Sequence, residues 1–343
     1  MKALQYTKIG GRPELKEVEK PSPGAGQVLI KVTAAGACHS DEFIMGASEE
    51  EYNFHPLPLT LGHEVVGVVD ELGAGTTGVE VGESVLVYGP WGCGRCYACS
   101  RGEENNCEKG TRAPGIFSPG GMAEYMVVDD PRHLIPLGDL DPVKSVSLTD
   151  AGLTPYHAVK RALHRLQPGS TAVVIGAGGL GHVAIQIIRA LSAATVIALD
   201  VAEPQLELAK KVGAHHTFPS DKSAIDSVKE LTGGHGADVV FDFVGIQPTA
   251  DIAQGMVRMR GIISVVGVGG GSVPAGYLTL PFDTQVQVVN WGSRSEMFEV
   301  LDLARAGVLT IETEEFAMDD GAKAYEKLHA GEIRGRAIVV PTR

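Results

Sequence analysis

Four of the five cysteines in this chain lie close together, at Cys93, Cys96, Cys99 and Cys107. Two consecutive C-x-x-C steps, followed by a thiol eight positions later, match a tetrahedral zinc site whose sulfur ligands lie about 2.3 Å from the ion. Four cysteine ligands leave no open position for a substrate. We therefore predict a structural zinc in a lobe of about residues 91–110, and Cys38 needs a separate explanation.

Disulfide bonds are the alternative for these four cysteines. The N-terminal residues 1–7 lack the apolar core of a signal peptide. Without an oxidising compartment, clustered cysteines are more often metal ligands than bridges. Zinc binding and a cytoplasmic location are therefore favoured.

A glycine-rich loop forms the second motif, with the sequence Gly176-Ala-Gly178-Gly179-Leu180-Gly181. The pattern G-x-G-x-x-G is weak alone, but here it follows a predicted strand and opens a predicted helix. The first glycine makes the turn, the second lets a pyrophosphate approach the backbone, and the third permits close packing of helix on strand. We predict a dinucleotide-binding loop; a glycine turn in an unrelated α/β sheet is the alternative.

Asp200 indicates which dinucleotide binds. It ends the next predicted strand, nineteen residues after Gly181, where a carboxylate can accept hydrogen bonds from ribose hydroxyls and repel a 2′-phosphate. Residues 201–204 contain no Arg or Lys that would neutralise such a phosphate. NAD is therefore predicted over NADP, although Asp200 could also cap the helix that begins near Glu203.

Cys38 and His63 are two further metal ligands by type, each placed in a loop near the end of a predicted strand. One cysteine and one histidine make a weak case by themselves. A buried free thiol and a packed histidine are the simpler interpretation of these two residues alone.

Composition excludes several classes of partner. The chain has 343 residues and a formal net charge of −13, which disfavours nucleic acid and anionic membrane surfaces. Its apolar fraction of 44% suits an ordinary folded protein with a large core. The apolar tract 171–199 contains His182, Gln186 and Arg189, so we interpret it as strand, turn, helix and strand rather than a membrane span.

The hydrophobic pattern divides the chain near residue 150. Residues 1–150 hold short valine-rich runs between turn residues, which predict a mostly antiparallel β domain. Residues 151–293 alternate predicted strands and helices, which predict a parallel sheet covered on both faces. Residues 294–343 are expected to return to the first domain.

Five motifs in order resemble those of the medium-chain zinc-dependent alcohol dehydrogenases, over nearly the whole chain. They are Cys38-His-Ser-Asp41, Gly62-His-Glu-Val-Val-Gly67, the four-cysteine lobe, Asp150-Ala-Gly-Leu-Thr154 and the glycine loop. The chain looks most similar to the bacterial secondary-alcohol dehydrogenases of that family. The resemblance implies a GroES-like mostly-β catalytic domain, a Rossmann doubly wound coenzyme domain, NAD as cofactor and two zinc ions per chain.

The resemblance further implies that Cys38, His63 and Asp150 hold a catalytic zinc. Many members of the family have cysteine at the third position, so Asp150 is a departure, although a carboxylate is a competent zinc ligand. Glu64 is the substitute ligand if Asp150 does not bind.

A proton relay and cofactor contacts are also implied. Ser40 matches the hydroxyl that takes the alcohol proton, and Asp41 is expected to orient the His63 imidazole. Thr154 is expected near the nicotinamide, and Arg334 resembles an arginine that binds the cofactor phosphate; a solvated surface charge is the alternative for Arg334.

Phe43 is a second departure, because several members have a histidine there as the exit for the proton. His39 is the candidate for that exit, against a role restricted to phosphate contact. Phe43 and Trp291 would make the substrate pocket apolar, which suits medium-sized secondary or aryl alcohols and their ketones.

Three other functions remain open at this stage. The first is a polyol or amino-alcohol dehydrogenase of the same superfamily, and the second is a zinc-free quinone or enoyl reductase. The third is a non-catalytic structural relative that keeps the fold. The family also implies a homodimer or homotetramer that pairs through a strand near residues 285–289.

Overall fold

The computed structural model describes residues 1–341 and divides the chain into two compact units. One unit joins Met1–Asp150 to Ser293–Arg343, and the other is Ala151–Gly292. Within the described residues, no helix has the length and apolarity that crossing a membrane requires.

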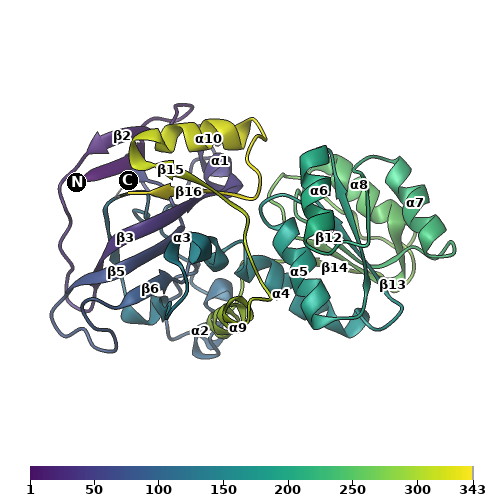
Figure 1. Ribbon diagram of the computed structural model, residues 1–343, viewed down its shortest axis with the longest axis horizontal. Helices are drawn as coiled ribbons and strands as arrows, with labels where there is room; N and C mark the ends of the chain where they lie inside the picture. The colour runs from purple at the N-terminus through teal and green to yellow at the C-terminus, as the bar shows by residue number, and fades with distance from the viewer. Residues whose placement is uncertain (342–343) are drawn as a thin grey trace. The chain divides into compact units, whose positions relative to one another are not determined.

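The first unit is built on two β-sheets. The smaller one is antiparallel, in the order β2-β1-β4, and consists of β1 (Lys2–Tyr6), β2 (Glu14–Glu17) and β4 (Leu59–Thr60). The larger one has the order β15-β16-β3-β5-β6-β8, with β7 paired to β3, and consists of β3 (Val28–Ala37), β5 (Glu64–Leu72), β6 (Ser84–Val87), β7 (Tyr125–Val128), β8 (Leu134–Pro136), β15 (Thr313–Ala317) and β16 (Arg336–Val340). The C-terminal strand β16 lies antiparallel to β3, as Figure 1 shows.

Short helices connect these strands. They are α1 (His39–Met45), α2 (Tyr97–Ser100), α3 (Pro142–Ser145), α9 (Arg294–Arg305) and α10 (Gly321–His329), with 3₁₀ turns at Glu104–Asn106, Pro131–His133, Val146–Thr149 and Met318–Asp320. The cysteine lobe, which includes α2, lies between β6 and β7 in the chain.

The expectation that His39, Ser40 and Asp41 form the first turn of α1, and Cys38 is its N-cap in extended conformation. A capping box explains the helix start, because the Asp41 carboxylate accepts a hydrogen bond from the Cys38 N–H at 3.1 Å.

The second unit is a six-stranded parallel sheet in the order β11-β10-β9-β12-β13-β14. Its strands are β9 (Thr171–Ile175), β10 (Thr195–Asp200), β11 (His216–Pro219), β12 (Ala237–Asp242), β13 (Val257–Val265) and β14 (Gln285–Val288). Its helices are α4 (Leu153–Ala162), α5 (Gly181–Leu191), α6 (Glu203–Lys211), α7 (Ser223–Leu231) and α8 (Gln247–Met256), with a 3₁₀ turn at Leu163–Arg165. Numbered from β9, the order is 3-2-1-4-5-6, which confirms the predicted doubly wound Rossmann arrangement.

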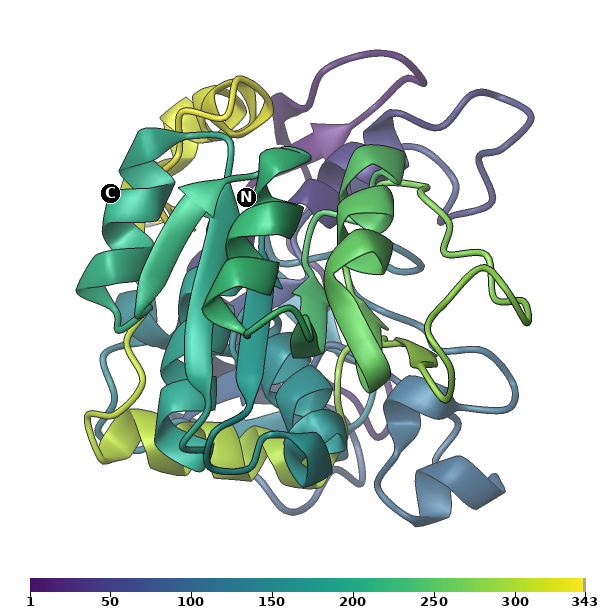
Figure 2. The ribbon, with the colours of Figure 1, turned by 90° about the vertical axis from the view of Figure 1, so that its right-hand side faces the viewer.

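Helices cover both faces of this sheet, as Figure 2 shows. Strand β9 is therefore buried on both faces along its whole length, which explains its continuous apolar sequence. Helix α5, expected from Gly179, begins at Gly181 because the preceding residues form the glycine loop. Strand β12, expected to run to Val244, ends at Asp242, whose carboxylate accepts hydrogen bonds from the N–H groups of Val244 and Gly245 at 3.0 and 2.9 Å.

Candidate active site and metal centres

A buried group of potential metal ligands lies at the edge of the β3–β5 pair in the first unit. The Cys38 thiol, the His63 imidazole and the Asp150 carboxylate, together with Glu64, place their ligand atoms within 4.8 Å of one another. The Asp150 Oδ2 lies 3.5 Å from the Cys38 Sγ and 3.7 Å from the His63 Nε2. The three residues that the sequence singled out thus converge, which is the geometry that a shared ion requires.

Local structure explains how distant residues meet here. Cys38 follows directly on β3, and His63 directly precedes β5, the antiparallel neighbour of β3. Gly62 makes the turn before His63 with a φ of +94°, and a Cβ at that position would lie 2.7 Å from the Met122 side chain. Asp150 follows the 3₁₀ turn Val146–Thr149.

Glu64 reaches the group over a glycine. Gly36 is paired with Glu64 across β3 and β5, and a Cβ at Gly36 would lie 2.0 Å from the Glu64 Oε2. Glycine at position 36 therefore leaves the space that the Glu64 carboxylate fills.

Arg336 is the functional residue that the sequence did not reveal. It begins β16, is 2% exposed, pairs with Glu64 and lies 3.7 Å from the Asp150 Oδ2. Arg334, which the resemblance suggested as a phosphate ligand, is exposed two residues earlier and keeps that role only as a prediction. The pairing of β16 with β3 is long-range, so sequence spacing alone did not select Arg336.

The charge of this group favours a bound cation. Four acidic side chains are buried together, Cys38, Glu64, Asp150 and Asp41. If all four ionise, four negative charges face the single positive charge of Arg336, and uncompensated buried charge is strongly unfavourable. A divalent ion removes two of the three excess charges, and the thiolate, imidazole and carboxylate donors suit Zn²⁺.

The Cys38 thiol is prepared for ionisation. Burial raises its pKa, but the Arg336 charge and the His63 imidazole outweigh burial and bring the pKa below its ordinary value. Since the thiolate is the form that binds metal, this shift favours a ligand role for Cys38.

Asp41 orients His63. The fully buried Asp41 carboxylate contacts the His63 Nδ1 at 3.1 Å through its Oδ1, which leaves the Nε2 directed to the ligand group. Burial lowers the pKa of His63, yet the Asp41 charge and the hydrogen bonds from its neighbours raise it well above the ordinary value.

The other predicted site residues lie in both units. Ser40 Oγ is 3.7 Å from the Cys38 Sγ, and His39 lies in the same helical turn with an exposed side chain. Phe43, also on α1, is 56% exposed and meets Phe54 edge to face with ring centroids 6.3 Å apart. The remaining two residues, both in the second unit, are Thr154, buried on α4, and Trp291.

The four cysteines of the lobe also converge. Their sulfur atoms lie within 4.8 Å of one another, and all five cysteines of the chain are free thiols, so the disulfide alternative is excluded. Backbone N–H groups of Arg95 and Cys96 are directed to the Cys93 sulfur and help to lower the pKa of this thiol to about 6. Burial raises the pKa of Cys99 to about 12, so a bound cation is needed to hold that sulfur as a thiolate.

A buried charged network attaches the lobe to the sheet. The Glu104 Oε2 accepts hydrogen bonds from the Gly92 N–H at 2.8 Å and the His133 Nε2 at 3.0 Å. The His133 Nδ1 contacts the Asp129 Oδ1 at 2.8 Å, and its ring stacks on Trp91 with centroids 5.4 Å apart. The segment that leads into Cys93 is thus held by ionic contacts as well as by any metal.

The glycine loop has the geometry predicted for dinucleotide binding. Gly176 has a φ of +83°, which favours glycine, and a Cβ at Gly181 would lie 1.8 Å from the Gly176 carbonyl oxygen. A Cβ at Gly178 would meet no atom within 4 Å among the described residues. The open space lies at the glycine over which a pyrophosphate is expected to approach.

Asp200 is tied to this loop. Its Oδ2 accepts a hydrogen bond from the Ala177 N–H at 2.7 Å, and its Oδ1 accepts one from the Ala202 N–H at 3.0 Å. Each carboxylate oxygen keeps a lone pair for a ribose hydroxyl. The neighbouring Val201 is 87% exposed and carries no positive charge for a 2′-phosphate.

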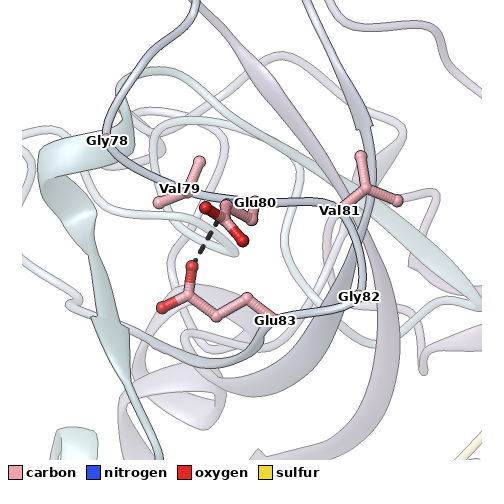
Figure 3. Close-up of a pocket in the computed structure, with 6 residues that line it drawn as sticks. All are labelled: Gly78, Val79, Glu80, Val81, Gly82 and Glu83. Atoms are coloured by element: carbon pink, nitrogen blue, oxygen red, sulfur yellow. Dashed lines mark hydrogen bonds between the residues drawn. The ribbon is translucent and has the colours of Figure 1, made fainter.

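A cavity of about 800 Å³ elsewhere in the first unit has a different character. Figure 3 shows that one loop lines it, from Gly78 to Glu83, and that the Glu80 N–H donates to the Glu83 carboxylate at 3.2 Å. Its lining residues include neither cysteine nor histidine, so the metal centres remain the stronger candidate site.

Comparisons with known proteins agree with both units. Residues 24–139 match the family described as alcohol dehydrogenase GroES-like domain, and residues 179–306 match that described as zinc-binding dehydrogenase. An NAD-dependent alcohol dehydrogenase from Sulfurisphaera tokodaii is 36% identical, over 99% of this chain and 100% of that protein.

Solved structures show the same similarity. The alcohol dehydrogenase of the hyperthermophilic archaeon Aeropyrum pernix has a TM-score of 0.93 and 34% identity, over 99% of this chain and 100% of that chain. Acetophenone reductase from Geotrichum candidum, solved in complex with NAD, has a TM-score of 0.86 and 31% identity, over 99% of this chain and 97% of that chain.

The His133 network predicts a pH-dependent loss of stability. His133→Phe keeps an aromatic ring against Trp91 but leaves two buried carboxylates without their partner, so we expect a loss of about 3–5 kcal/mol in the free energy of unfolding near pH 6. Burial lowers the pKa of His133, but the hydrogen bonds to Asp129 and Glu104 outweigh burial and raise it. The contribution is therefore complete below the unfolded pKa of about 6.5 and disappears as the pH rises through the folded pKa.

Urea denaturation from pH 6 to pH 9 measures this effect. The difference between wild type and His133→Phe should shrink as the pH rises, and the exposed His235→Phe is the control. A difference that stays constant, or one that grows with pH, would contradict the network as described.

The open space at Gly178 predicts a variant that folds but binds cofactor weakly. Gly178→Ala should keep the melting temperature and raise the NADH dissociation constant by roughly tenfold, or about 1.4 kcal/mol, because the methyl group occupies the approach of the pyrophosphate. Gly181→Ala is the matched comparison and should lower the melting temperature as well. Fluorescence titration with NADH decides the matter, and an unchanged dissociation constant for Gly178→Ala would refute the loop's role.

Proposed function

The chain belongs to the family of zinc-binding alcohol dehydrogenases with a GroES-like domain, and we propose that its substrates are medium-sized secondary alcohols and the corresponding ketones. It is an NAD-dependent alcohol dehydrogenase, which converts an alcohol and NAD⁺ into a carbonyl compound, NADH and a proton. The observation that carries the site assignment is the buried convergence of Cys38, His63 and Asp150.

In this proposal Cys38, His63 and Asp150 hold the catalytic zinc. Bound zinc supplies Lewis acidity to the substrate oxygen, while NAD accepts the hydride from carbon. Three protein ligands leave room for the substrate, in contrast to the four-cysteine lobe. Asp150 stands where many members have cysteine, and its contact with Arg336 disperses the charge of this harder ligand.

Ser40 and His39 are proposed to move the alcohol proton. The Ser40 Oγ lies beside the ligand group, 3.7 Å from the Cys38 Sγ, so it can accept the proton of a substrate hydroxyl. The His39 side chain is exposed on the same helical turn and can release the proton to solvent. Phe43 cannot carry a proton, so this role falls on His39.

Aromatic side chains support the substrate class. Phe43 projects from α1, is 56% exposed and stacks edge-on against Phe54, so an apolar surface lies one helical turn beyond Ser40. We assign Phe43 and Trp291 to the pocket that holds the carbon skeleton. The similarity to an acetophenone reductase favours secondary alcohols with an aryl group.

The second unit is proposed to bind NAD through the glycine loop, with Asp200 at the adenosine ribose. Thr154 and Arg334 are proposed as further cofactor contacts. We place the enzyme in the cytoplasm, where its free thiols stay reduced.

A homodimer or homotetramer is also proposed. Strand β14 is the edge of the parallel sheet, and its Val286 and Val288 side chains are 36% and 80% exposed. An unpaired edge with apolar side chains favours pairing with a second copy.

Loss of the catalytic ligand Cys38 should abolish turnover without loss of cofactor binding. For Cys38→Ser we expect a fall in kcat of about three orders of magnitude or more, on the scale of the several kcal/mol that a metal contributes. The NADH dissociation constant should stay the same, since the glycine loop belongs to the other unit. Zinc content should fall from about two ions per chain to about one.

The control for Cys38→Ser is Cys99→Ser, which should lose the other zinc and lower the melting temperature. Retained alcohol oxidation by zinc-depleted Cys38→Ser would remove this metal from the reaction.

Cofactor preference should depend on Asp200. The double variant Asp200→Gly, Val201→Arg removes the repulsion of a 2′-phosphate and adds a guanidinium at an exposed position, so it should prefer NADP. Asp200→Asn, which keeps an oxygen acceptor for the Ala177 N–H, should weaken discrimination against NADP with a smaller loss of stability. The measurement is the ratio of kcat/KM for the two cofactors, and an unchanged ratio in the double variant would count against the ribose contact.

A further inference from the structure

A tyrosine from the far end of the chain contacts the carboxylate that orients His63. The Tyr325 hydroxyl, on α10, donates a hydrogen bond to the Asp41 Oδ2 at 2.9 Å, across 284 residues of sequence. Tyr325 is 3% exposed and Asp41 is fully buried, so water does not substitute readily for this contact.

Three donors from three segments hold the Asp41 carboxylate. The Oδ1 contacts the His63 Nδ1 at 3.1 Å, whereas the Oδ2 accepts from the Cys38 N–H at 3.1 Å and from Tyr325. Because a carboxylate is planar, fixing the Oδ2 also fixes where the Oδ1 lies. The direction of the His63 ring therefore depends on contacts made to the other oxygen.

The hydrogen bond has one possible sense. Burial, and then the neighbouring charge of Asp41, raise the pKa of Tyr325 well above its ordinary value. The phenol therefore stays protonated at any pH at which the enzyme works, and it always donates to the carboxylate.

We propose that Tyr325 is a positioning residue for the catalytic metal, which holds Asp41 in the orientation that directs the His63 Nε2 to the site shared with Cys38 and Asp150. This inference rests on the proposed function, since it concerns the same metal. Groups that orient a histidine ligand typically change metal affinity by about 10- to 100-fold when they are removed. Tyr325 acts on His63 through Asp41, so its effect should approach the lower end of that range.

The competing explanation is that Tyr325 only stabilises α10 against α1, as any buried tyrosine would. Tyr6 provides the matched control in the same unit. It is fully buried, donates to the Met45 carbonyl at 3.1 Å and accepts from the Gly10 N–H at 2.8 Å. Tyr6→Phe thus removes an equivalent buried hydroxyl that has no link to Asp41.

The test is the release of zinc from the folded holoenzyme into excess chelator, followed with a metal-sensitive dye. Tyr325→Phe should speed release of the catalytic zinc about tenfold and leave release from the cysteine lobe unchanged, while Tyr6→Phe should alter neither. With Co²⁺ as the only metal supplied, the visible absorption bands of the catalytic site should shift in Tyr325→Phe and not in Tyr6→Phe. Equal release rates in Tyr325→Phe and wild type, or equal acceleration in both variants, would overturn the proposal.

A double-variant cycle keeps the proposal testable if stability changes as well. If Tyr325 acts through Asp41, the effects of Tyr325→Phe and Asp41→Asn on the zinc release rate should not add. Additive effects would contradict the proposal. Wild-type enzyme that holds zinc only in the cysteine lobe would instead refute the proposed function, so the two failures are distinguishable.

Discussion

A buried excess of negative charge constrains this protein more than any other feature. The groups that produce it, the Cys38 thiol and three carboxylates, lie together at the β3–β5 edge with one guanidinium beside them. Such a group is unfavourable in an apolar interior unless a cation completes it. The same donors that need the cation also match the ligands that zinc prefers, so stability and Lewis acidity have a common origin.

The fold meets this constraint by bringing ends of elements to one point. Cys38 ends β3, His63 precedes β5, and Arg336 begins β16, three strands that are neighbours in one sheet. Asp41 joins local and long-range structure, since it caps α1 through the Cys38 N–H and holds His63 with its other oxygen. A helix start and a metal ligand are thus fixed by one carboxylate, with a tyrosine of α10 behind it.

Local sequence was sufficient for the elements whose chemistry is contiguous. The glycine loop, the strand Thr171–Ile175 and the four-cysteine lobe each carry their pattern within a short segment, and each occurs as predicted. Helix α1 was missed because its seven residues are too few to show an apolar period. Arg336 and Tyr325 were missed because their partners lie about 270 or more residues away in the chain, where only the sheet and helix packing can place them.

Diffraction at the zinc absorption edge tests the central claim most directly, with crystals of active, zinc-replete enzyme. We expect two anomalous peaks per chain, one among the four lobe cysteines and one in contact with the Cys38 sulfur, a His63 nitrogen and an Asp150 oxygen. A single peak in the cysteine lobe, from protein that still oxidises alcohols, would contradict the assignment of a catalytic metal to the buried cluster.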